Sequence, residues 1–338
     1  MSNVFVVVIG RNEGERLTNC LDSLLFQLID SHRIVYVDSG SCDLSCEIAY
    51  GKGVQVIELD ASIPFTAARA RNAGWRWLHD AYPDIEYVQF VDGDCELADK
   101  WIAISVNFLE NNERFGVVCG RRREKHPDAS HYNRLADMEW NTPIGETMAC
   151  GGDALIRFEA LRSVEGYNSN LICGEEPEMC IRMRRKGWLI QRIDAEMTHH
   201  DLDMHHFGQW WKRSIRGGWA IAEGATMYGS SPERYMVREQ ISGWLWGLIV
   251  PLISIGLTWF TKGWSLLFLT VYLFLGLRIY LYRHHQRQDF TSHSCIYAIF
   301  CTFSKFPQVL GQLSYWKTYW RGETSTIIEY KHPSRKGV

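Results

Sequence analysis

Residues 87–97 read YVQFVDGDCEL, a mainly apolar run that ends in two aspartates separated by one glycine. The apolar part has the composition of a buried β-strand. Asp92 and Asp94 stand two positions apart, so their side chains point the same way on an extended chain, and Gly93 lets the backbone approach a ligand closely. Paired carboxylates repel each other unless a cation compensates them, and their oxygen atoms suit Mg²⁺ or Mn²⁺ shared with phosphates. The stretch therefore predicts a metal–diphosphate site at a strand end, although D-G-D alone is also a common turn sequence.

Three other β-branched apolar runs precede this strand, at residues 4–10, 33–40 and 54–59. The segments between the runs have helical spacing, and one of them begins after Thr66, which suits an N-cap. Alternation of strands and helices with short links predicts a parallel, doubly wound α/β sheet. In such a sheet, ligands bind beyond the carboxyl ends of the strands.

The composition and the motifs that do not occur narrow the functional class. The chain has 338 residues and a net charge of −3, so no overall field indicates nucleic-acid binding. The patterns G-x-G-x-x-G, G-x-x-x-x-G-K-[ST] and G-x-S-x-G do not occur, which argues against a dinucleotide fingerprint, a P-loop and a hydrolase elbow. Ten cysteines without a C-x-x-C pair indicate reduced thiols in a cytosol-facing protein, and residues 1–10 do not read as a signal peptide.

Motifs along residues 4–190 stand in an order that resembles the family 2 glycosyltransferases of the GT-A fold. VVVIGRNEGERLTNCLDSLL (6–25) is similar to the family's opening strand, N-E turn and helix, with Gly10-Arg11 in place of the usual proline and aromatic residue. The sequence then resembles the second-strand motif in YVDSGSCD, the A-R-N-x-G helix in AARARNAG, the D-x-D metal motif in DGD, and the G-E-D-x-x-L-x-x-R helix of the catalytic base in GEEPEMCIRMRRKG. The resemblance implies a GT-A fold, a Rossmann-like, mostly parallel doubly wound sheet, followed by an all-α C-terminal membrane-associated region.

The resemblance also implies which residues bind a UDP- or GDP-linked sugar. Its nucleotide would contact the ends of the strands and the A-R-N helix, at Arg11, Asn12, Glu13, Asp38, Ser39, Gly40, Arg71, Asp92 and Gly93. Asp94 would coordinate Mn²⁺ or Mg²⁺ directly, and Asp92 would face the ribose or the metal. Related enzymes can supply a late histidine ligand where this chain has His200, within MTHHDLDMHHF (197–207). The alternative for that segment is a polar loop with solvated histidines.

The family's catalytic base would be Glu176, at a position where Asp is usual, and Glu175 is the neighbouring alternative. Pro177 suits the first position of a helix and Gly187 the residue just past its end, so Glu176 would lie at a helix N-terminus, where the dipole favours the anion. An ionised base can take the proton of an acceptor hydroxyl that attacks the anomeric carbon. One carboxylate base with in-line attack predicts inversion at that carbon. Without the other motifs, EEPE would read as an ordinary acidic first turn.

A further catalytic candidate lies in CGGDALIR, residues 150–157. Asp153 follows two glycines at the start of an expected strand. Its carboxylate would either face the donor sugar or the acceptor, or cap a turn, and the sequence leaves both readings open.

The C-terminal third is rich in apolar and aromatic residues. Residues 243–260 and 264–277 are uncharged runs near the shortest length of a membrane span, and they predict a helical hairpin over 243–281. Aromatic residues near their ends resemble an interfacial belt, and arginines outside both runs place the flanks and the catalytic domain on the cytoplasmic side. Residues 295–320 predict an amphipathic segment along the membrane surface. The alternative is a pair of buried helices in a soluble protein.

These patterns predict a GT-A domain over 1–228, with a nucleotide-binding half at 1–96 and an acceptor half at 97–228, and a hydrophobic helical region over 229–338. The leading hypothesis is an inverting, metal-dependent glycosyltransferase of the hexosyltransferase type at the cytoplasmic face of the cell membrane. Its acceptor would be a hydroxyl or phosphate of a glycan linked to a polyprenyl lipid, in cell-surface polysaccharide or glycolipid synthesis. Two alternatives stay open: a non-catalytic sugar-nucleotide-binding membrane protein, and a nucleotidyltransferase.

Overall fold

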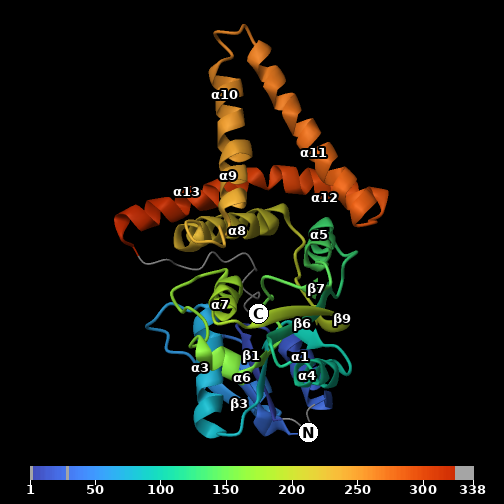
Figure 1. Ribbon diagram of the computed structural model, residues 1–338, viewed down its shortest axis with the longest axis vertical. Helices are drawn as coiled ribbons and strands as arrows, with labels where there is room; N and C mark the ends of the chain where they lie inside the picture. Colours follow the sequence, from blue (N-terminus) through green and yellow to red (C-terminus); the bar gives the residue numbers. More distant parts are fainter. Residues whose placement is uncertain (1–2, 28–29, 324–338) are drawn as a thin grey trace. The chain divides into compact units, whose positions relative to one another are not determined.

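The computed structural model describes residues 3–27 and 30–323, and Figure 1 draws them as a ribbon coloured along the chain. Contacts in space between Cα atoms divide the chain into two compact units. Over the described residues, the first unit holds the chain up to Pro127 together with Glu139–Asp203, and the second holds Asp128–Met138 and residues 204–323. The first unit is an α/β structure and the second is helical.

The first unit is built, over its described residues, on a nine-stranded mixed sheet in the order β3-β2-β1-β4-β8-β6-β9-β5, with β7 paired to β9. Its parallel half consists of β1 (Val4–Gly10), β2 (Ile34–Asp38), β3 (Gln55–Glu58) and β4 (Tyr87–Asp92). These are the strands that the apolar runs predict, and β1, β2 and β4 are almost entirely buried, as strands covered on both faces are. The parallel register sets Gly10 beside Asp38 and Ile9 beside Asp92, so the polar ends of three strands meet at one edge.

The other half of the sheet mixes strand directions. β8 (Ala154–Arg157) runs antiparallel to β4 and to β6 (Phe115–Glu124), whereas β6 runs parallel to β9 (Leu189–His200). The short strands β5 (Cys95–Leu97) and β7 (Gly145–Glu146) pair antiparallel with β9. The pairing of β5 with β9 sets Cys95 opposite His200, which brings a residue from far along the chain next to the DGD turn.

The helices of the first unit alternate with its strands, as the sequence predicts. Helix α3 packs on β1 and β2, whereas α4 packs on β6, β8 and β9. The bounds of these helices are α1 (Glu15–Gln27), α2 (Ser45–Gly51), α3 (Ala67–Ala81), α4 (Trp101–Glu110), α6 (Phe158–Ser163) and α7 (Glu175–Arg185), with the short 3-10 helix η1 (Ser31–Arg33) and with α5 (His131–Trp140), which contributes to both units.

The predicted helix ends of α3 and α7 are confirmed with one correction. The hydroxyl of Thr66 accepts a hydrogen bond from the backbone N–H of Arg69 at 3.1 Å, which makes Thr66 the N-cap of α3. Gly187 follows the end of α7 with a φ of 91°, a conformation that favours glycine. Pro177 is the third residue of α7 rather than the first, because the helix begins earlier, with Gly174 at the N-cap.

The second unit is all-helical over its described residues. Helix α8 (Phe207–Tyr228) packs against α13 (Lys305–Arg321) and α9 (Val237–Trp244). Because α8 belongs to this compact unit, the unit begins before the domain boundary predicted at residue 228. The domain boundary at residue 228 therefore stays a prediction.

An apolar helical hairpin occupies the region around residues 243–281 (Figure 1). Its joint is highly exposed, with Trp259 at 87% and Phe260 at 81%. Among the described residues, one helix, Trp264–Gln286, is long and apolar enough to cross a membrane, which is weak support for a span by itself. The arms and the helix after them comprise α9, η2 (Leu245–Ile249), α10 (Val250–Gly256), η3 (Trp264–Thr270), α11 (Val271–Leu281), η4 (Tyr282–Gln286) and α12 (Thr291–Phe303).

Candidate active site

The DGD turn joins β4 to β5 at the edge where the polar strand ends meet. Asp92 is the last residue of β4, and Gly93 and Asp94 form the turn. The N–H of Gly93 donates to the carbonyl of Ile9 at 2.8 Å, which holds the turn against β1. A Cβ at Gly93 would lie 3.2 Å from Cγ of Glu13 and 3.2 Å from that carbonyl oxygen. The close approach therefore favours glycine, and it brings Glu13, a predicted nucleotide residue, against the turn.

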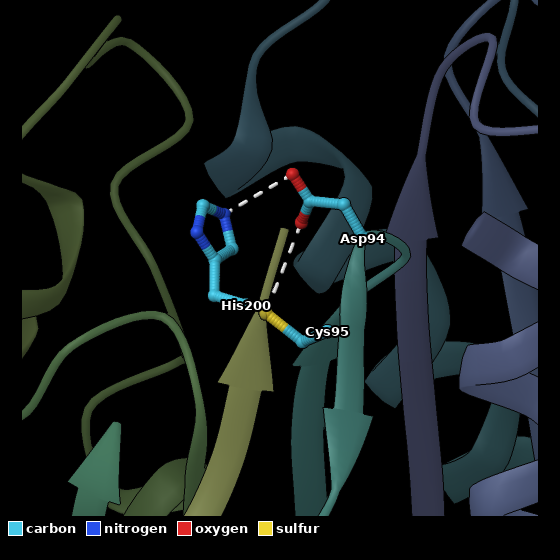
Figure 2. A group of neighbouring side chains, drawn as sticks. All are labelled: Asp94, Cys95 and His200. Carbon is cyan, nitrogen blue, oxygen red and sulfur yellow. Dashed lines mark hydrogen bonds and ion pairs between the residues drawn. The ribbon is translucent and has the colours of Figure 1, made fainter. Parts of the chain in front are cut away.

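Asp94 and His200 form a buried pair beside this turn (Figure 2). Nε2 of His200 lies 3.1 Å from Oδ2 of Asp94, and the two side chains are 5% and 3% exposed. The thiol of Cys95 lies 3.8 Å from Oδ1 of Asp94. One ligand atom from each of the three side chains lies within 4.8 Å of the other two.

Asp94 and His200 of this trio fit a divalent cation. Carboxylate oxygen and imidazole nitrogen are ordinary ligands of Mn²⁺ and related ions. Nδ1 of His200 is buried without a hydrogen-bond partner among the described residues, and the nearest carboxylate oxygen on that side, Oε2 of Glu124, is 3.8 Å away. The structure thus brings together Asp94 and His200, which the sequence analysis selected as metal ligands from separate segments.

Asp92 is bound by two arginines. Its Oδ1 lies 2.9 Å from Nη2 of Arg71, and its Oδ2 lies 3.2 Å from Nη2 of Arg122. Burial alone would raise the pKa of Asp92, but the two guanidinium groups outweigh burial and hold that pKa below its ordinary value. The sequence predicts a cation that compensates the acidic pair. For Asp92 the two arginines supply that charge, so a metal ion would be held mainly by Asp94.

Arg71 also reaches the first turn of α7. Its Nη1 lies 2.8 Å from Oε1 of Glu175 and 3.1 Å from Oε1 of Glu176. The side chain of Arg71 is 3% exposed, and its guanidinium carbon lies 5.5 Å from the ring centroid of Tyr167. One buried arginine from α3 therefore joins Asp92, at the end of β4, to both candidate bases.

Glu176 is the less buried of the two candidate bases, with 15% of its side chain exposed against 5% for Glu175. Burial, with the neighbouring Glu175 carboxylate, raises the pKa of Glu176 to about 7, although Arg71 and a backbone hydrogen bond act in the opposite direction. The backbone hydrogen bond favours the anion, as expected at a helix N-terminus, but removal from water disfavours the charge more strongly. A carboxylate with a pKa near neutrality is well matched to proton transfer.

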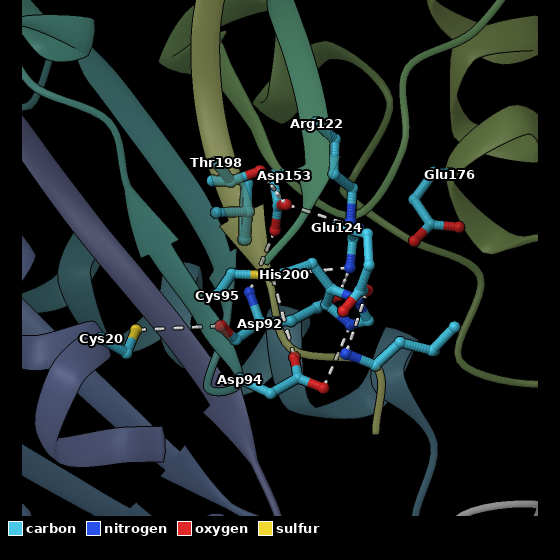
Figure 3. Close-up of polar contacts among 12 residues, drawn as sticks. Cys20, Asp92, Asp94, Cys95, Arg122, Glu124, Asp153, Glu176, Thr198 and His200 are labelled. Carbon is cyan, nitrogen blue, oxygen red and sulfur yellow. Dashed lines mark hydrogen bonds and ion pairs between the residues drawn. The ribbon is translucent and has the colours of Figure 1, made fainter. Parts of the chain in front are cut away.

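Asp153 lies immediately before β8, where Figure 3 shows it beside Thr198 and Arg122, and it is fully buried. Its Oδ1 accepts the backbone N–H of Asp92 at 3.1 Å, and its Oδ2 accepts the hydroxyl of Thr198 at 2.7 Å. Nη1 of Arg122 lies 3.4 Å from the same Oδ2. Asp153 therefore ties the end of β4 to β6 and β9, and its contact with a substrate stays a prediction.

Gly152 lies where three polar side chains converge. An added Cβ would be 2.6 Å from Nη2 of Arg71, 3.0 Å from Oδ2 of Asp92 and 3.2 Å from Oε1 of Glu176. At Gly151 an added Cβ would meet nothing within 4 Å. Of the two adjacent glycines, only the second is needed by the packing of the site.

The loop after β2 is organised by Asp38, which is 2% exposed. Its Oδ2 accepts the backbone N–H groups of Gly40 and Ser41 at 2.9 and 2.7 Å. The N–H of Ser39 donates to the carbonyl of Gly10 at 3.0 Å. Asp38 therefore shapes the loop at the carboxyl end of β2, where the nucleoside is predicted.

The residues after β1 face that loop. The side chain of Asn12 accepts a backbone N–H from the loop at 2.7 Å. Oε2 of Glu13 lies 2.9 Å from Nη2 of Arg16, and the guanidinium carbon of Arg11 lies 5.6 Å from the ring centroid of Phe65. The residues after β1 and β2 that are predicted to bind the nucleotide thus lie close together. Their contact with a nucleotide stays a prediction.

Sequence reasoning missed several polar residues of the site, namely Arg122, Glu124 and Thr198. Arg122 and Glu124 lie two positions apart on β6, so their side chains point the same way. The signal was present in GVVCGRRREK, where an apolar strand continues into a run of consecutive charged residues. Thr198 carried no signal of its own, because only the pairing of β9 with β5 and β6 brings it to Asp153.

Comparison with known proteins agrees with this geometry. Residues 5–164 match the sequence model described as glycosyl transferase family 2. The O-antigen chain rhamnosyltransferase RfbN of Salmonella typhimurium is 21% identical over 212 residues, which is 58% of this chain. The match spans 66% of that relative, just under two thirds of its length.

Solved structures of similar fold include the mannosyltransferase PcManGT from Pyrobaculum calidifontis in complex with GDP-Man and Mn²⁺, with a TM-score of 0.58 and 18% identity over 92% of this chain and 87% of that chain. S. aureus TarS 1–349 has a TM-score of 0.51 and 13% identity over 96% of this chain and 92% of that chain. The mixed sheet with its parallel half, the helical C-terminal region and these neighbours confirm the predicted GT-A fold. Over residues 5–164 the chain matches glycosyl transferase family 2, in agreement with the GT-A fold of the first unit.

Proposed function

We propose that the protein is an inverting, metal-dependent glycosyltransferase that moves a sugar from a nucleotide-sugar donor to a glycan acceptor. The observation that carries the proposal is the buried arginine bridge, in which Arg71 joins Asp92 of the DGD turn to Glu176. The relative named as an O-antigen chain rhamnosyltransferase supports a role in cell-surface polysaccharide or glycolipid synthesis. The neighbour in complex with GDP-Man and Mn²⁺ supports a nucleotide-sugar donor and a metal ion.

Different residues of the chain would bind different parts of the donor. The loops after β1 and β2, organised by Asn12 and Asp38, would receive the nucleoside. Asp94 and His200 would hold Mn²⁺ or Mg²⁺ beside the diphosphate, and the ion would neutralise charge on the departing diphosphate. Asp92 keeps Arg71 in place, and the ribose or the metal is its predicted partner.

Glu176 would act on the acceptor. Its carboxylate takes the proton from the acceptor hydroxyl as that oxygen forms a bond to the anomeric carbon and the bond from this carbon to the diphosphate breaks. Burial keeps the pKa of Glu176 at about 7, so the group is ionised often enough to accept the proton and basic enough to hold it. A single displacement by one base inverts the anomeric configuration.

Release of the nucleoside diphosphate tests the proposal directly. The full chain is incubated with Mn²⁺ and each of a panel of UDP-, GDP- and dTDP-linked sugars, with membrane lipid extracts as the acceptor source, and the products are identified by mass spectrometry. Metal-dependent release with transfer of the sugar is expected for one of these donors. Donor binding without any release would indicate a non-catalytic binding protein. Formation of a nucleotide sugar and pyrophosphate from a sugar phosphate and a nucleoside triphosphate would indicate a nucleotidyltransferase.

Gly152→Ala is expected to lower kcat/KM by about 10²-fold, because a methyl group there displaces the guanidinium of Arg71 and the carboxylates around it. Gly51→Ala, at the C-terminal end of α2, is the matched control, since its methyl group meets nothing within 4 Å, and we expect it to stay within about twofold of wild type. Both variants are compared by donor turnover and by thermal unfolding. Equal activity of the two folded variants would contradict the placement of the site.

The proposal also places the protein at the cytoplasmic face of the cell membrane, with the apolar hairpin in lipid. Large apolar side chains on both arms are exposed, including Leu252 at 59%, Leu273 at 73% and Phe274 at 71%. A continuous exposed apolar surface of this kind marks an interaction with lipid or protein. Membrane attachment would suit an acceptor glycan carried on a polyprenyl lipid.

Phe274→Asp is expected to weaken binding to lipid vesicles by about 10²-fold, because an aspartate at the centre of a membrane helix costs about 2.5–3.5 kcal/mol. Phe26→Asp is the matched control, since Phe26 is equally exposed, at 78%, but lies on α1 of the first unit. Co-sedimentation with vesicles of anionic and neutral phospholipid measures both. Wild-type protein that stays in the supernatant, or equal binding by the two variants, would contradict the membrane assignment.

A further inference from the structure

A cavity of about 240 Å³ in the first unit adjoins the candidate active site. It is lined in part by Arg122 and Asp153, and both of these residues contact Asp92. Trp140 also lines the cavity, and its ring meets the imidazole of His200 edge to face with 4.8 Å between centroids. The cavity therefore begins beside both the predicted metal ligand and the DGD turn. The sugar of a donor anchored there by its diphosphate would extend toward this space.

The indole of Trp140 forms a fixed wall of the cavity. The guanidinium carbon of Arg122 lies 5.0 Å from the centroid of the indole ring. Nη1 of Arg192 donates to the carbonyl of Trp140 at 2.9 Å and is also hydrogen-bonded to the hydroxyl of Thr142. A rigid aromatic wall with nearby polar groups is typical of pockets for small polar ligands, and the volume is below that of pockets for drug-sized molecules, which begin at about 300 Å³.

The cavity is also lined by three sulfur-bearing side chains, Cys119, Cys150 and Met197, which we call the sulfur floor. Burial raises the pKa of the Cys119 thiol to about 12, and the contact with the Cys180 thiol, together with burial, raises that of Cys150, so both thiols stay neutral. The sulfur of Met197 accepts the backbone N–H of Gly120 at 3.3 Å, which fixes its position. Thiols and thioethers are weak hydrogen-bonding groups. A hydroxyl held against the sulfur floor would lose water without gaining a strong partner.

We propose that this cavity receives the sugar ring of the donor and selects a hexose whose C6 is a methyl group over one whose C6 carries a hydroxyl. Trp140 packs on the ring, the threonines at 142 and 147 meet ring hydroxyls, and the sulfur floor meets C6. The inference rests on the proposed function, because the diphosphate has to be anchored at Asp94 and His200 for the sugar to reach the cavity. An apolar pocket rejects an added hydroxyl by about 10²-fold at most, which bounds the selectivity.

Binding of matched donor pairs to the full wild-type chain tests the inference. GDP-mannose and GDP-6-deoxymannose differ only at C6, as do the glucose and 6-deoxyglucose esters of UDP and dTDP. For the nucleotide that the protein binds with Mn²⁺, calorimetry is expected to give a Kd about 10- to 100-fold lower for the 6-deoxy sugar. Equal affinities, or tighter binding of the hexose, overturn the inference and leave the proposed function intact. If no nucleotide sugar binds, the proposed function fails and the inference fails with it.

Variants of the cavity assign the selectivity to its walls. Cys119→Ser puts a stronger hydrogen-bonding group on the sulfur floor and is expected to narrow the ratio of the two affinities about fivefold, the effect of one net hydrogen bond. Cys46→Ser, on α2 outside the cavity, is the control and keeps the wild-type ratio. Trp140→Leu is expected to weaken binding of both sugars by a larger factor than binding of the free nucleoside diphosphate with Mn²⁺, which is affected only through the contact of the indole with His200. A wild-type ratio in folded Cys119→Ser, or in Cys150→Ser where Cys119→Ser does not fold, overturns the role of the sulfur floor.

Discussion

Glu176→Gln is expected to lower kcat for sugar transfer by about 10²- to 10⁴-fold while the Kd of the donor changes little. Gln has nearly the same size as Glu but cannot accept the proton of the acceptor hydroxyl. The groups that would anchor the donor, Asp94 and His200, lie on other elements and keep their positions. Initial rates at saturating donor, and donor affinity by calorimetry, separate the two effects.

Two control variants assign the effect to one carboxylate. Glu159→Gln removes an exposed carboxylate from the first turn of α6 and is expected to leave kcat within about twofold. Glu175→Gln removes the partner of Arg71 rather than the base, so we expect a smaller loss than for Glu176→Gln. A larger loss in Glu175→Gln would assign the role of catalytic base to Glu175. Normal transfer by Glu176→Gln would assign that role to another residue of the site.

The pH dependence of kcat/KM should also identify Glu176 as the base. Glu176 is a carboxylic acid whose pKa is raised to about 7, and only its ionised form accepts a proton, so activity is present above that pKa and is lost as the pH falls through it. We expect kcat/KM to fall about tenfold per pH unit below pH 6, and this limb should be missing from the residual activity of Glu176→Gln. A wild-type profile that is flat between pH 5 and 8 would contradict the assignment, whatever the rate of the variant.

Asp94→Asn is expected to reduce donor affinity in the presence of Mn²⁺ by about 10²-fold and to reduce turnover by at least as much, because a metal ion contributes several kcal/mol to charge stabilisation at a diphosphate. The amide keeps the shape of the side chain and removes its charge. The Kd of the variant for the donor should match the Kd of wild type measured in EDTA, which shows that the lost affinity is metal affinity.

Asp99→Asn is the control for this experiment, since Asp99 is exposed a few residues farther along the chain. It should retain the Mn²⁺ dependence of wild type. Equal donor affinity with and without Mn²⁺ in the wild-type protein would contradict the proposed role of a metal ion. An unchanged Mn²⁺ dependence in Asp94→Asn would contradict the role of Asp94 as its ligand.

The strands, several helix ends and the position of the site were predictable because they depend on short-range signals. The buried runs at 4–10 and 87–92 need no partner to be identified as strands, and Thr66 caps α3 through a bond to Arg69 three residues later. The order of strands and helices then fixes the edge at which their carboxyl ends meet. This is why Asp94 could be selected as a ligand before its neighbours were known.

The links between distant segments were not predictable, because they depend on register and on side-chain reach. No local signal indicates that Arg71 contacts both Asp92 and Glu176, or that Gly152 leaves the space in which they meet. The raised pKa of Glu176 could not be predicted for the same reason. The helix N-terminus is visible in the sequence, whereas the burial that outweighs it is a property of the packed structure.

The most direct test of the central claim is an anomalous difference map from crystals grown with Mn²⁺ and a nucleotide sugar that the protein binds, recorded at the manganese absorption edge. The account predicts a peak within coordination distance of Asp94 and His200 and in contact with the diphosphate of the donor. A map in which the donor is bound but no manganese lies between its diphosphate and Asp94 would contradict it.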